Sequence, residues 1–124
     1  MASRVLVVDD DPVIQNLLRV NFEMEGYEVI VASDGVEGLE RARRDAPDVV
    51  VCDIMMPRMD GLTVAREMKA DPATAGIPIL LLSAKAQQAD VQAGVDAGAD
   101  DYVTKPFDPL NLLERVGALL DGQR

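Results

Sequence analysis

Histidine is absent from the 124-residue sequence, and its absence restricts the available chemistry. Without an imidazole, the chain has no histidine base and no histidine metal ligand. The single cysteine, Cys52, excludes an internal disulfide and fits a reducing compartment. Catalysis or metal binding would therefore depend on Asp, Glu, Ser, Tyr and Lys side chains.

Basic residues are also scarce, with 12 Lys+Arg against 22 Asp+Glu and a net charge of -10. A negative field of this kind argues against direct binding to nucleic acid. No apolar run approaches the roughly 20 residues that a membrane-spanning helix needs, and the first residues do not resemble a signal peptide. We therefore expect a cytoplasmic protein with no membrane contact.

The glycine motifs of nucleotide-binding proteins are missing as well. Neither G-x-G-x-x-G nor G-K-[ST] follows an apolar run, which argues against dinucleotide or nucleoside triphosphate binding. A chain of this length can bury roughly two-thirds of its unfolded surface around one core. Because no repeat, low-complexity segment or change of composition interrupts it, we predict a single domain over residues 1–124.

Five short segments have the composition of strands, and four of them are almost continuously apolar. Such runs are typical of strands that are buried on both faces of a parallel sheet, whereas the second segment alternates. The five segments are Val5–Val8, Glu28–Ala32, Val49–Cys52, Ile79–Leu82 and Tyr102–Val103.

Helical spacing of apolar residues separates these segments. Before the first helix, Asp11 is placed as an N-cap, Pro12 occupies the first helical position, and Gly26 follows the end. A fourth helix, near residues 87–97, has Val91 and Val95 as its apolar positions. The last helix should begin at Asp108–Pro109 and bury four apolar residues: Leu110, Leu113, Val116 and Leu120.

The alternation of strands and helices predicts right-handed crossover connections and an α/β fold. We predict a doubly wound, five-stranded parallel sheet in the flavodoxin-like order 2-1-3-4-5, with helices on both faces. In such sheets ligands bind at the carboxyl ends of the strands, near the point where the strand order reverses.

Polar side chains follow four of the five predicted strands. Asp9 and Asp10 follow the first, Asp53 the third, Ser83 the fourth and Lys105 the fifth. Three carboxylates without histidine or thiol ligands favour a hard cation, and Mg²⁺ suits a small cluster that leaves positions for phosphate oxygens. A carboxylate nucleophile with a hydroxyl and an ammonium group beside Mg²⁺ can form an aspartyl-phosphate.

These segments resemble the receiver domain of bacterial two-component response regulators, of the chemotaxis-receiver type. The resemblance rests on "VLVVDDDP", "VVVCDIMMPRMDG", "IPILLLSA" and "GADDYVTKPF", in this order along the chain. It implies that Asp53 accepts phosphate from a sensor histidine kinase or a histidine phosphotransfer protein. It also implies that Asp10, Asp53 and the Met55 carbonyl bind Mg²⁺ directly, and that Asp9 acts mainly through water.

The resemblance further implies a signalling switch rather than an enzyme. Ser83 and Lys105 would contact the phosphoryl group, Ser83 and Tyr102 would move on activation, and the Lys105–Pro106 peptide would be cis. The changed surface would be formed by the last two helices and the last strand. It would be read by an unidentified downstream protein or by an output domain that is not in this chain, with the receiver as a monomer or a phosphorylation-dependent dimer.

Some positions depart from the family pattern. Met55 is apolar and cannot position an attacking water, so we expect slow intrinsic loss of phosphate. Asp11 is interpreted as a helix cap rather than a third metal ligand. Asp101 and Arg115 fit the charge pattern of a receiver dimer, but residues 87–97 contain no Lys or Arg.

An enzymatic alternative is a phosphatase of the haloacid dehalogenase type. In that interpretation "VLVVDDDPV" would supply Asp9 as nucleophile and Asp11 as acid and base. The acidic pair that should follow the motif lysine instead precedes Lys105, and Asp53 is left without a role.

Overall fold

The computed structural model describes residues 2–122, in which five strands alternate with five helices. The strands are β1 (Arg4–Val8), β2 (Glu28–Ala32), β3 (Val49–Asp53), β4 (Ile79–Ser83) and β5 (Asp101–Thr104). The helices are α1 (Pro12–Met24), α2 (Gly35–Asp45), α3 (Gly61–Ala70), α4 (Gln88–Asp96) and α5 (Pro109–Asp121). Residues 1, 123 and 124 of the predicted domain lie outside the described residues.

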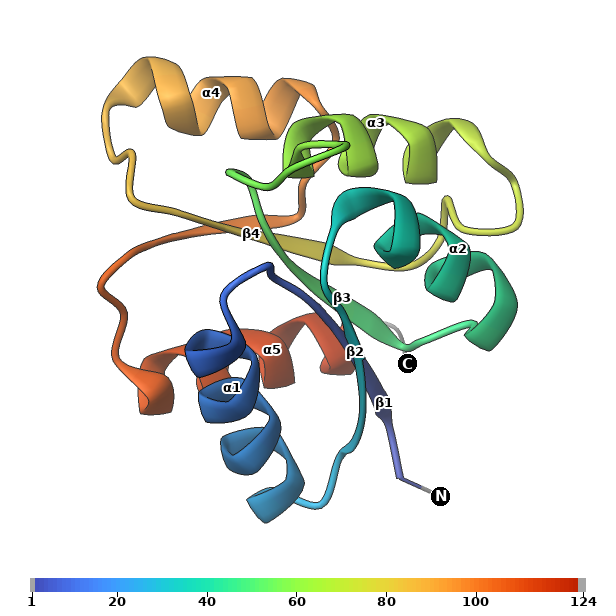
Figure 1. The fold of residues 1–124 in the computed structure, drawn as a ribbon, viewed down its shortest axis with the longest axis vertical. Helices are drawn as coiled ribbons and strands as arrows, with labels where there is room; N and C mark the ends of the chain where they lie inside the picture. The colour runs from blue at the N-terminus through green and yellow to red at the C-terminus, as the bar shows by residue number, and fades with distance from the viewer. Residues whose placement is uncertain (1, 123–124) are drawn as a thin grey trace.

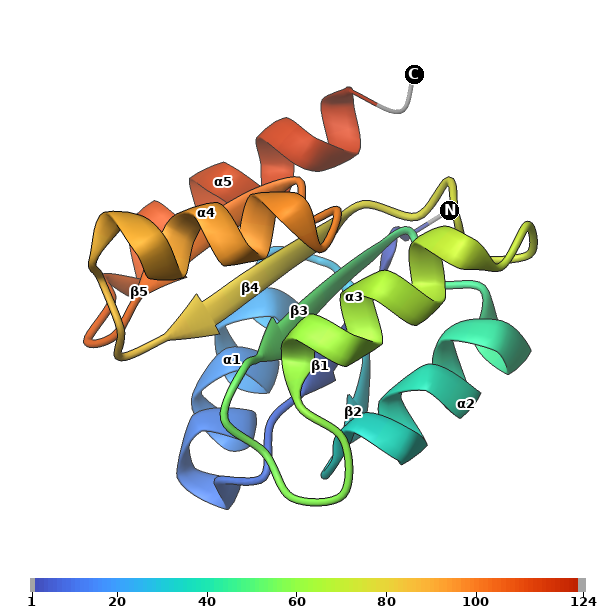
Figure 2. The same cartoon turned by 90° about the horizontal axis from the view of Figure 1, so that it is seen from above.

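All five strands are parallel, and the sheet order is β2-β1-β3-β4-β5. The predicted doubly wound topology is therefore confirmed, with the strand order reversing between β1 and β3. Figures 1 and 2 show α1 and α5 on one face of the sheet and α2, α3 and α4 on the other. Among residues 2–122, no helix has the length and apolar character needed to cross a membrane.

The three central strands account for most of the core. Every side chain of Val5–Val8, Val49–Val51 and Ile79–Leu82 is buried, as their continuous apolar character predicts. Full burial of one Val or Leu side chain contributes roughly 1.5–3 kcal/mol relative to exposure. Alternate residues of each strand face α1 and α5 or α2 and α3, so the sheet separates two apolar clusters.

Aspartates cap four of the five helices at their N-termini. The Asp11 carboxylate accepts a 2.9 Å hydrogen bond from the Val13 N–H, which confirms its predicted capping role. Asp34, Asp60 and Asp108 accept equivalent bonds at the starts of α2, α3 and α5. The Asp11 carboxylate, which lies next to the predicted site in the sequence, is therefore a helix cap.

The predicted apolar face of α5 is partly wrong. Leu110 is 68 % exposed, whereas Leu112 is buried together with Val116, four residues further along the helix. Leu113 and Leu120 flank this stripe and are partly buried. Leu110 lies in the first turn, off the Leu112–Val116 stripe that contacts the sheet.

The apolar face predicted for α4 also differs, because Val95 is 55 % exposed. Gly94 is buried instead and lies against the Tyr102 ring, where a Cβ atom would come within 2.9 Å of Tyr102 Cδ2. Since α4 approaches the sheet through this glycine and the buried Ala97, the neighbouring valine faces solvent.

Candidate functional site

The register of the sheet brings the predicted site residues to one edge. Val8 of β1 pairs with Cys52 of β3, so Asp9 and Asp53 follow on adjacent strands. Ser83 pairs with Thr104, and the next residue along the chain is Lys105. The four polar strand ends therefore converge, as the topology predicts.

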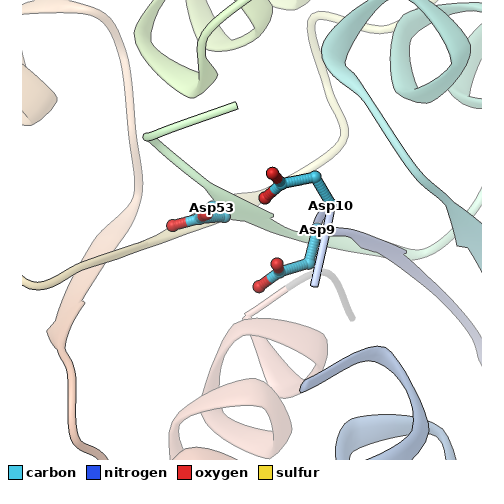
Figure 3. Close-up of side chains that lie close together, drawn as sticks. All are labelled: Asp9, Asp10 and Asp53. Carbon is cyan, nitrogen blue, oxygen red and sulfur yellow. The ribbon is translucent and has the colours of Figure 1, made fainter. Parts of the chain in front are cut away.

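Three carboxylates form the acidic cluster of this edge. One oxygen from each of Asp9, Asp10 and Asp53 lies within 4.8 Å of the others. Figure 3 shows the three side chains gathered at the ends of β1 and β3. Asp9 and Asp53 are buried, with 0 % and 5 % exposure, whereas Asp10 is exposed.

Lys105 supplies a positive charge beside the acidic cluster. Its Nζ lies 3.3 Å from Asp9 Oδ2 and 3.3 Å from Asp53 Oδ1. Burial raises the pKa of Asp53, an effect that Lys105 opposes and the Asp9 charge reinforces. Burial disfavours the charged form of Lys105, but the Asp9 and Asp53 carboxylates outweigh it and raise the lysine pKa.

The residues of the cluster fit a magnesium ion. Lys105 balances only part of the charge of three carboxylates, and two of those carboxylates are buried where charge is costly. All three donors are oxygens, which hard divalent cations prefer. Asp9 Oδ1 also accepts a 2.9 Å bond from the Asp11 N–H, whereas the exposed Asp10 carboxylate is more accessible.

Met55 lies in the loop between β3 and α3. Its side chain is 60 % exposed beside the acidic edge. The loop returns to α3 where the Gly61 N–H donates a 2.9 Å bond to the Ile54 carbonyl. A Cβ at Gly61 would collide with the Asp53 carbonyl, so glycine allows α3 to start against the end of β3.

Ser83 and Tyr102 are joined through the backbone of Lys85. The buried Ser83 Oγ accepts a 3.1 Å bond from the Lys85 N–H. The Tyr102 hydroxyl donates a 2.7 Å bond to the Lys85 carbonyl. Because both contacts use backbone groups, the identity of residue 85 gives no sequence signal for this connection. The Lys105–Pro106 peptide is cis, as the resemblance implies.

One polar side chain of the site was missed by the sequence reasoning. The Gln15 amide, in the first turns of α1, donates to the Asp9 carbonyl and to Ser33 Oγ, the latter at 3.1 Å. Its position four residues after Asp11 places it near the β1 end, but nothing in the sequence separates it from other polar helix residues.

Comparison with known proteins identifies the family. The profile of the response regulator receiver domain matches residues 5–117, so the chain belongs to this family. The Synechocystis DNA-binding dual master transcriptional regulator RpaA is 48% identical over 117 residues, which cover 94% of this chain and 48% of that protein. The chain spans about half the length of the curated relatives it matches.

Solved structures agree with this assignment. The receiver domain of Francisella response regulator 1452 has a TM-score of 0.93 and 34% identity, covering 98% of this chain and 99% of that one. The receiver domain of the sensor histidine kinase PA1611 from Pseudomonas aeruginosa has a TM-score of 0.90 and 30% identity, with coverage of 98% and 99%. The latter has a magnesium ion coordinated in its active-site cleft.

Family membership decides between the two interpretations of the acidic strand end. The chain is a receiver domain, a signalling switch, and not a phosphatase of the haloacid dehalogenase type. The geometry agrees, since Asp9 is fully buried and its carboxylate accepts the Asp11 N–H, whereas Asp53 retains 5 % exposure. Lys105 lies 3.3 Å from both carboxylates.

Proposed function

We propose that residues 1–124 act as one receiver unit in which Asp53 accepts a phosphoryl group from a sensor histidine kinase or a histidine phosphotransfer protein. The observation that carries this proposal is the position of Asp53, which is buried, has an oxygen within 4.8 Å of oxygens of Asp9 and Asp10, and lies 3.3 Å from the Lys105 ammonium. Asp10, Asp53 and the Met55 carbonyl would hold Mg²⁺, with Asp9 acting mainly through water.

The reaction is a displacement at phosphorus. An Asp53 carboxylate oxygen forms the new O–P bond while the P–N bond to the donor imidazole breaks, and the imidazole leaves with the bonding electron pair. When bound, Mg²⁺ supplies charge neutralisation of the phosphoryl oxygens. Lys105 would bind one of these oxygens, and the Ser83 hydroxyl would donate a hydrogen bond to another.

Movement of Ser83 toward the phosphoryl group would act on Tyr102 through Lys85. A shift of Ser83 Oγ would disturb its hydrogen bond from the Lys85 N–H. Because the carbonyl of the same residue accepts the bond from the Tyr102 hydroxyl, the disturbance would reach Tyr102. Tyr102 packs against Gly94 of α4, so its reorientation would alter the α4–β5–α5 face. A downstream protein or an output domain would recognise that face.

The phosphorylation-dependent dimer remains the weaker of the two oligomeric states that we propose. Arg115 Nη1 lies 2.8 Å from Asp101 Oδ1 within the same chain, so this pair is already satisfied in the monomer. Helix α4 contributes no Lys or Arg to a partner. These observations favour the monomer.

The exposed Met55 side chain should make the phosphorylated state long-lived. A thioether offers no strong hydrogen bond to position an attacking water near Asp53. We predict that Met55→Asn shortens the lifetime, measured as the decay of phosphorylated protein after the donor is removed. A lifetime of seconds in the unsubstituted protein would contradict this prediction.

Intact-mass spectrometry tests the proposed function. The protein is incubated with acetyl phosphate and Mg²⁺, alongside Asp53→Asn, a metal-free sample and Asp96→Asn as a matched aspartate on α4. One added phosphoryl group that needs both the metal and Asp53 supports the proposal. Incorporation that persists in Asp53→Asn, or no incorporation together with no binding of beryllofluoride, would overturn it.

A further inference from the structure

The start of α2 receives contacts from both loops that would carry the magnesium ligands. On the β1 side, Gln15 donates to the Asp9 carbonyl and to Ser33 Oγ. The Ser33 N–H in turn donates a 2.6 Å bond to Glu37 Oε1, in the first turn of α2. A continuous series of hydrogen bonds therefore connects the Asp9 backbone with the N-terminus of α2.

On the β3 side, the loop that carries Met55 reaches the same helix end. Arg58 Nη1 lies 3.0 Å from Asp34 Oδ2. The Met59 backbone lies so close to Gly35 that a Cβ at position 35 would overlap it. The two loops thus meet at residues 33–37, although 24 residues separate Arg58 from Asp34 in the sequence.

Asp34 is well suited to fix the position of this loop. Its side chain is 16% exposed, and its other oxygen accepts a 2.8 Å bond from the Glu37 N–H as the N-cap of α2. Arg58 adopts a φ of 67°, a left-handed conformation that is unfavourable for a residue with a Cβ. The Arg58 guanidinium contacts the Asp34 carboxylate, which its capping bond holds in place. This contact therefore fixes the loop in the left-handed conformation at Arg58.

We propose that Gln15, Ser33, Asp34, Glu37 and Arg58 form a polar brace that sets the separation of the Asp9–Asp10 segment from the Asp53–Met55 segment, and thereby the Mg²⁺ affinity of the receiver. These residues would be positioning residues, because none of them contacts the metal or the phosphoryl group. The inference rests on the proposed function, since it assumes that both segments bind the same cation.

Calorimetric titration of the metal-free protein with Mg²⁺ alone tests the brace. Arg58→Ala removes the guanidinium, whereas Arg58→Lys keeps a cation at the same backbone conformation. Arg43→Gln is the matched control, because Arg43 forms an ion pair of similar length (2.9 Å to Asp71) on α2 but is not connected to either loop. Gln15→Met removes the amide donor beside Asp9 at nearly constant length.

The expected order of affinities follows from the contacts. The Mg²⁺ dissociation constant should rise roughly threefold in Arg58→Ala, as the loss of a partly exposed ion pair allows. It should rise about tenfold in Gln15→Met, because a group that orients the ligand segment directly is lost. Arg58→Lys should restore most of the affinity, and Arg43→Gln should leave it unchanged.

The results that would overturn the brace differ in whether they also overturn the proposed function. Unchanged Mg²⁺ affinity in Arg58→Ala and Gln15→Met, or an equal loss in Arg43→Gln, would overturn the brace alone. No Mg²⁺ binding by the unsubstituted protein would overturn the brace and the proposed function together. The thermal unfolding of each variant is measured without metal beside its titration. If Mg²⁺ affinity falls in proportion to stability in every variant, including the Arg43→Gln control, the result counts against the brace.

Discussion

At both ends of the sheet a basic side chain lies beside acidic ones, but Arg4 at the amino edge and Lys105 at the carboxyl edge differ in burial. At the amino edge, Arg4 Nε lies 3.5 Å from Glu28 Oε2, and both side chains are about half exposed. At the carboxyl edge, Lys105 Nζ lies 3.3 Å from Asp9 and Asp53, whose side chains are 1% and 7% exposed. Similar charges at similar distances therefore stand in different solvent environments.

The comparison indicates that burial, rather than pairing, distinguishes the receiver site. Water screens the amino-edge pair, and such exposed pairs contribute about 0–1 kcal/mol. At the carboxyl edge, burial raises the pKa of Asp53, and Lys105 balances only part of the negative charge. In such a site the carboxylates have too little water and too little positive charge around them. The binding of a cation or the neutralisation of Asp53 therefore lowers its free energy.

The largest difference between the two edges should come from removal of the cations. Lys105→Met leaves the buried Asp9 and Asp53 carboxylates without their ammonium partner. We expect the free energy of unfolding of the metal-free protein at pH 7 to fall by about 2 kcal/mol, less than for a fully enclosed pair. The rate of phosphate incorporation should fall about 100-fold with the loss of a phosphoryl contact. Urea denaturation and intact-mass kinetics measure the two effects.

Mg²⁺ provides an internal control for this substitution. Added metal should recover much of the stability lost in Lys105→Met, because it neutralises the same carboxylates, but it should not recover the rate. If Arg4→Met costs as much stability as Lys105→Met, the contrast between the two edges is wrong.

A smaller effect should follow from neutralising Asp53. Because its folded-state pKa lies above the unfolded value of about 3.9, the Asp53 carboxyl stabilises the fold below that pH, and this contribution is lost as pH rises through the folded-state pKa. Asp53→Asn cannot titrate. The metal-free variant should therefore be more stable than the unsubstituted protein at pH 7, and this advantage should diminish toward pH 4.

Asp71→Asn is a control of opposite sign for the same pH series. The Ala73 N–H and the Arg43 guanidinium lower the pKa of Asp71, so its contribution is present above the unfolded pKa and is lost as pH falls through the folded-state value. Its neutralisation should not stabilise the protein at pH 7. A parallel pH response in both variants would show that burial does not control the Asp53 carboxyl.

The fold followed from the sequence because its signals are local and repeated. Continuous apolar runs predicted the buried strands, and the prediction of Asp11 as a helix cap was confirmed by its bond to Val13. The convergence of Asp9, Asp53 and Lys105 followed from topology, since parallel strands end at one edge. Nothing beyond strand order was needed for this part of the site.

The remaining features depend on distances between segments that periodicity does not encode. Leu110 and Val95 have apolar side chains at helical spacing, yet they are exposed because the helices approach the sheet through Leu112 and Gly94. The contacts of Gln15 with Asp9 and of Arg58 with Asp34 join loops whose separation the sequence does not give. Such contacts need the packed structure.

The smallest effects are expected at the amino edge. Glu28→Gln removes the partner of Arg4 while both groups remain accessible to water. The free energy of unfolding should fall by less than about 0.5 kcal/mol, and the difference should vanish at high salt because the pair is already screened. Urea denaturation at low and at about 1 M NaCl measures both quantities.

A loss of stability above about 1 kcal/mol that persists in high salt would contradict the comparison, because solvent exposure would then not distinguish the two edges. Pairing alone would then account for the charges at both ends of the sheet, and the burial of Asp53 would no longer support the carboxyl edge as the proposed phosphoacceptor site.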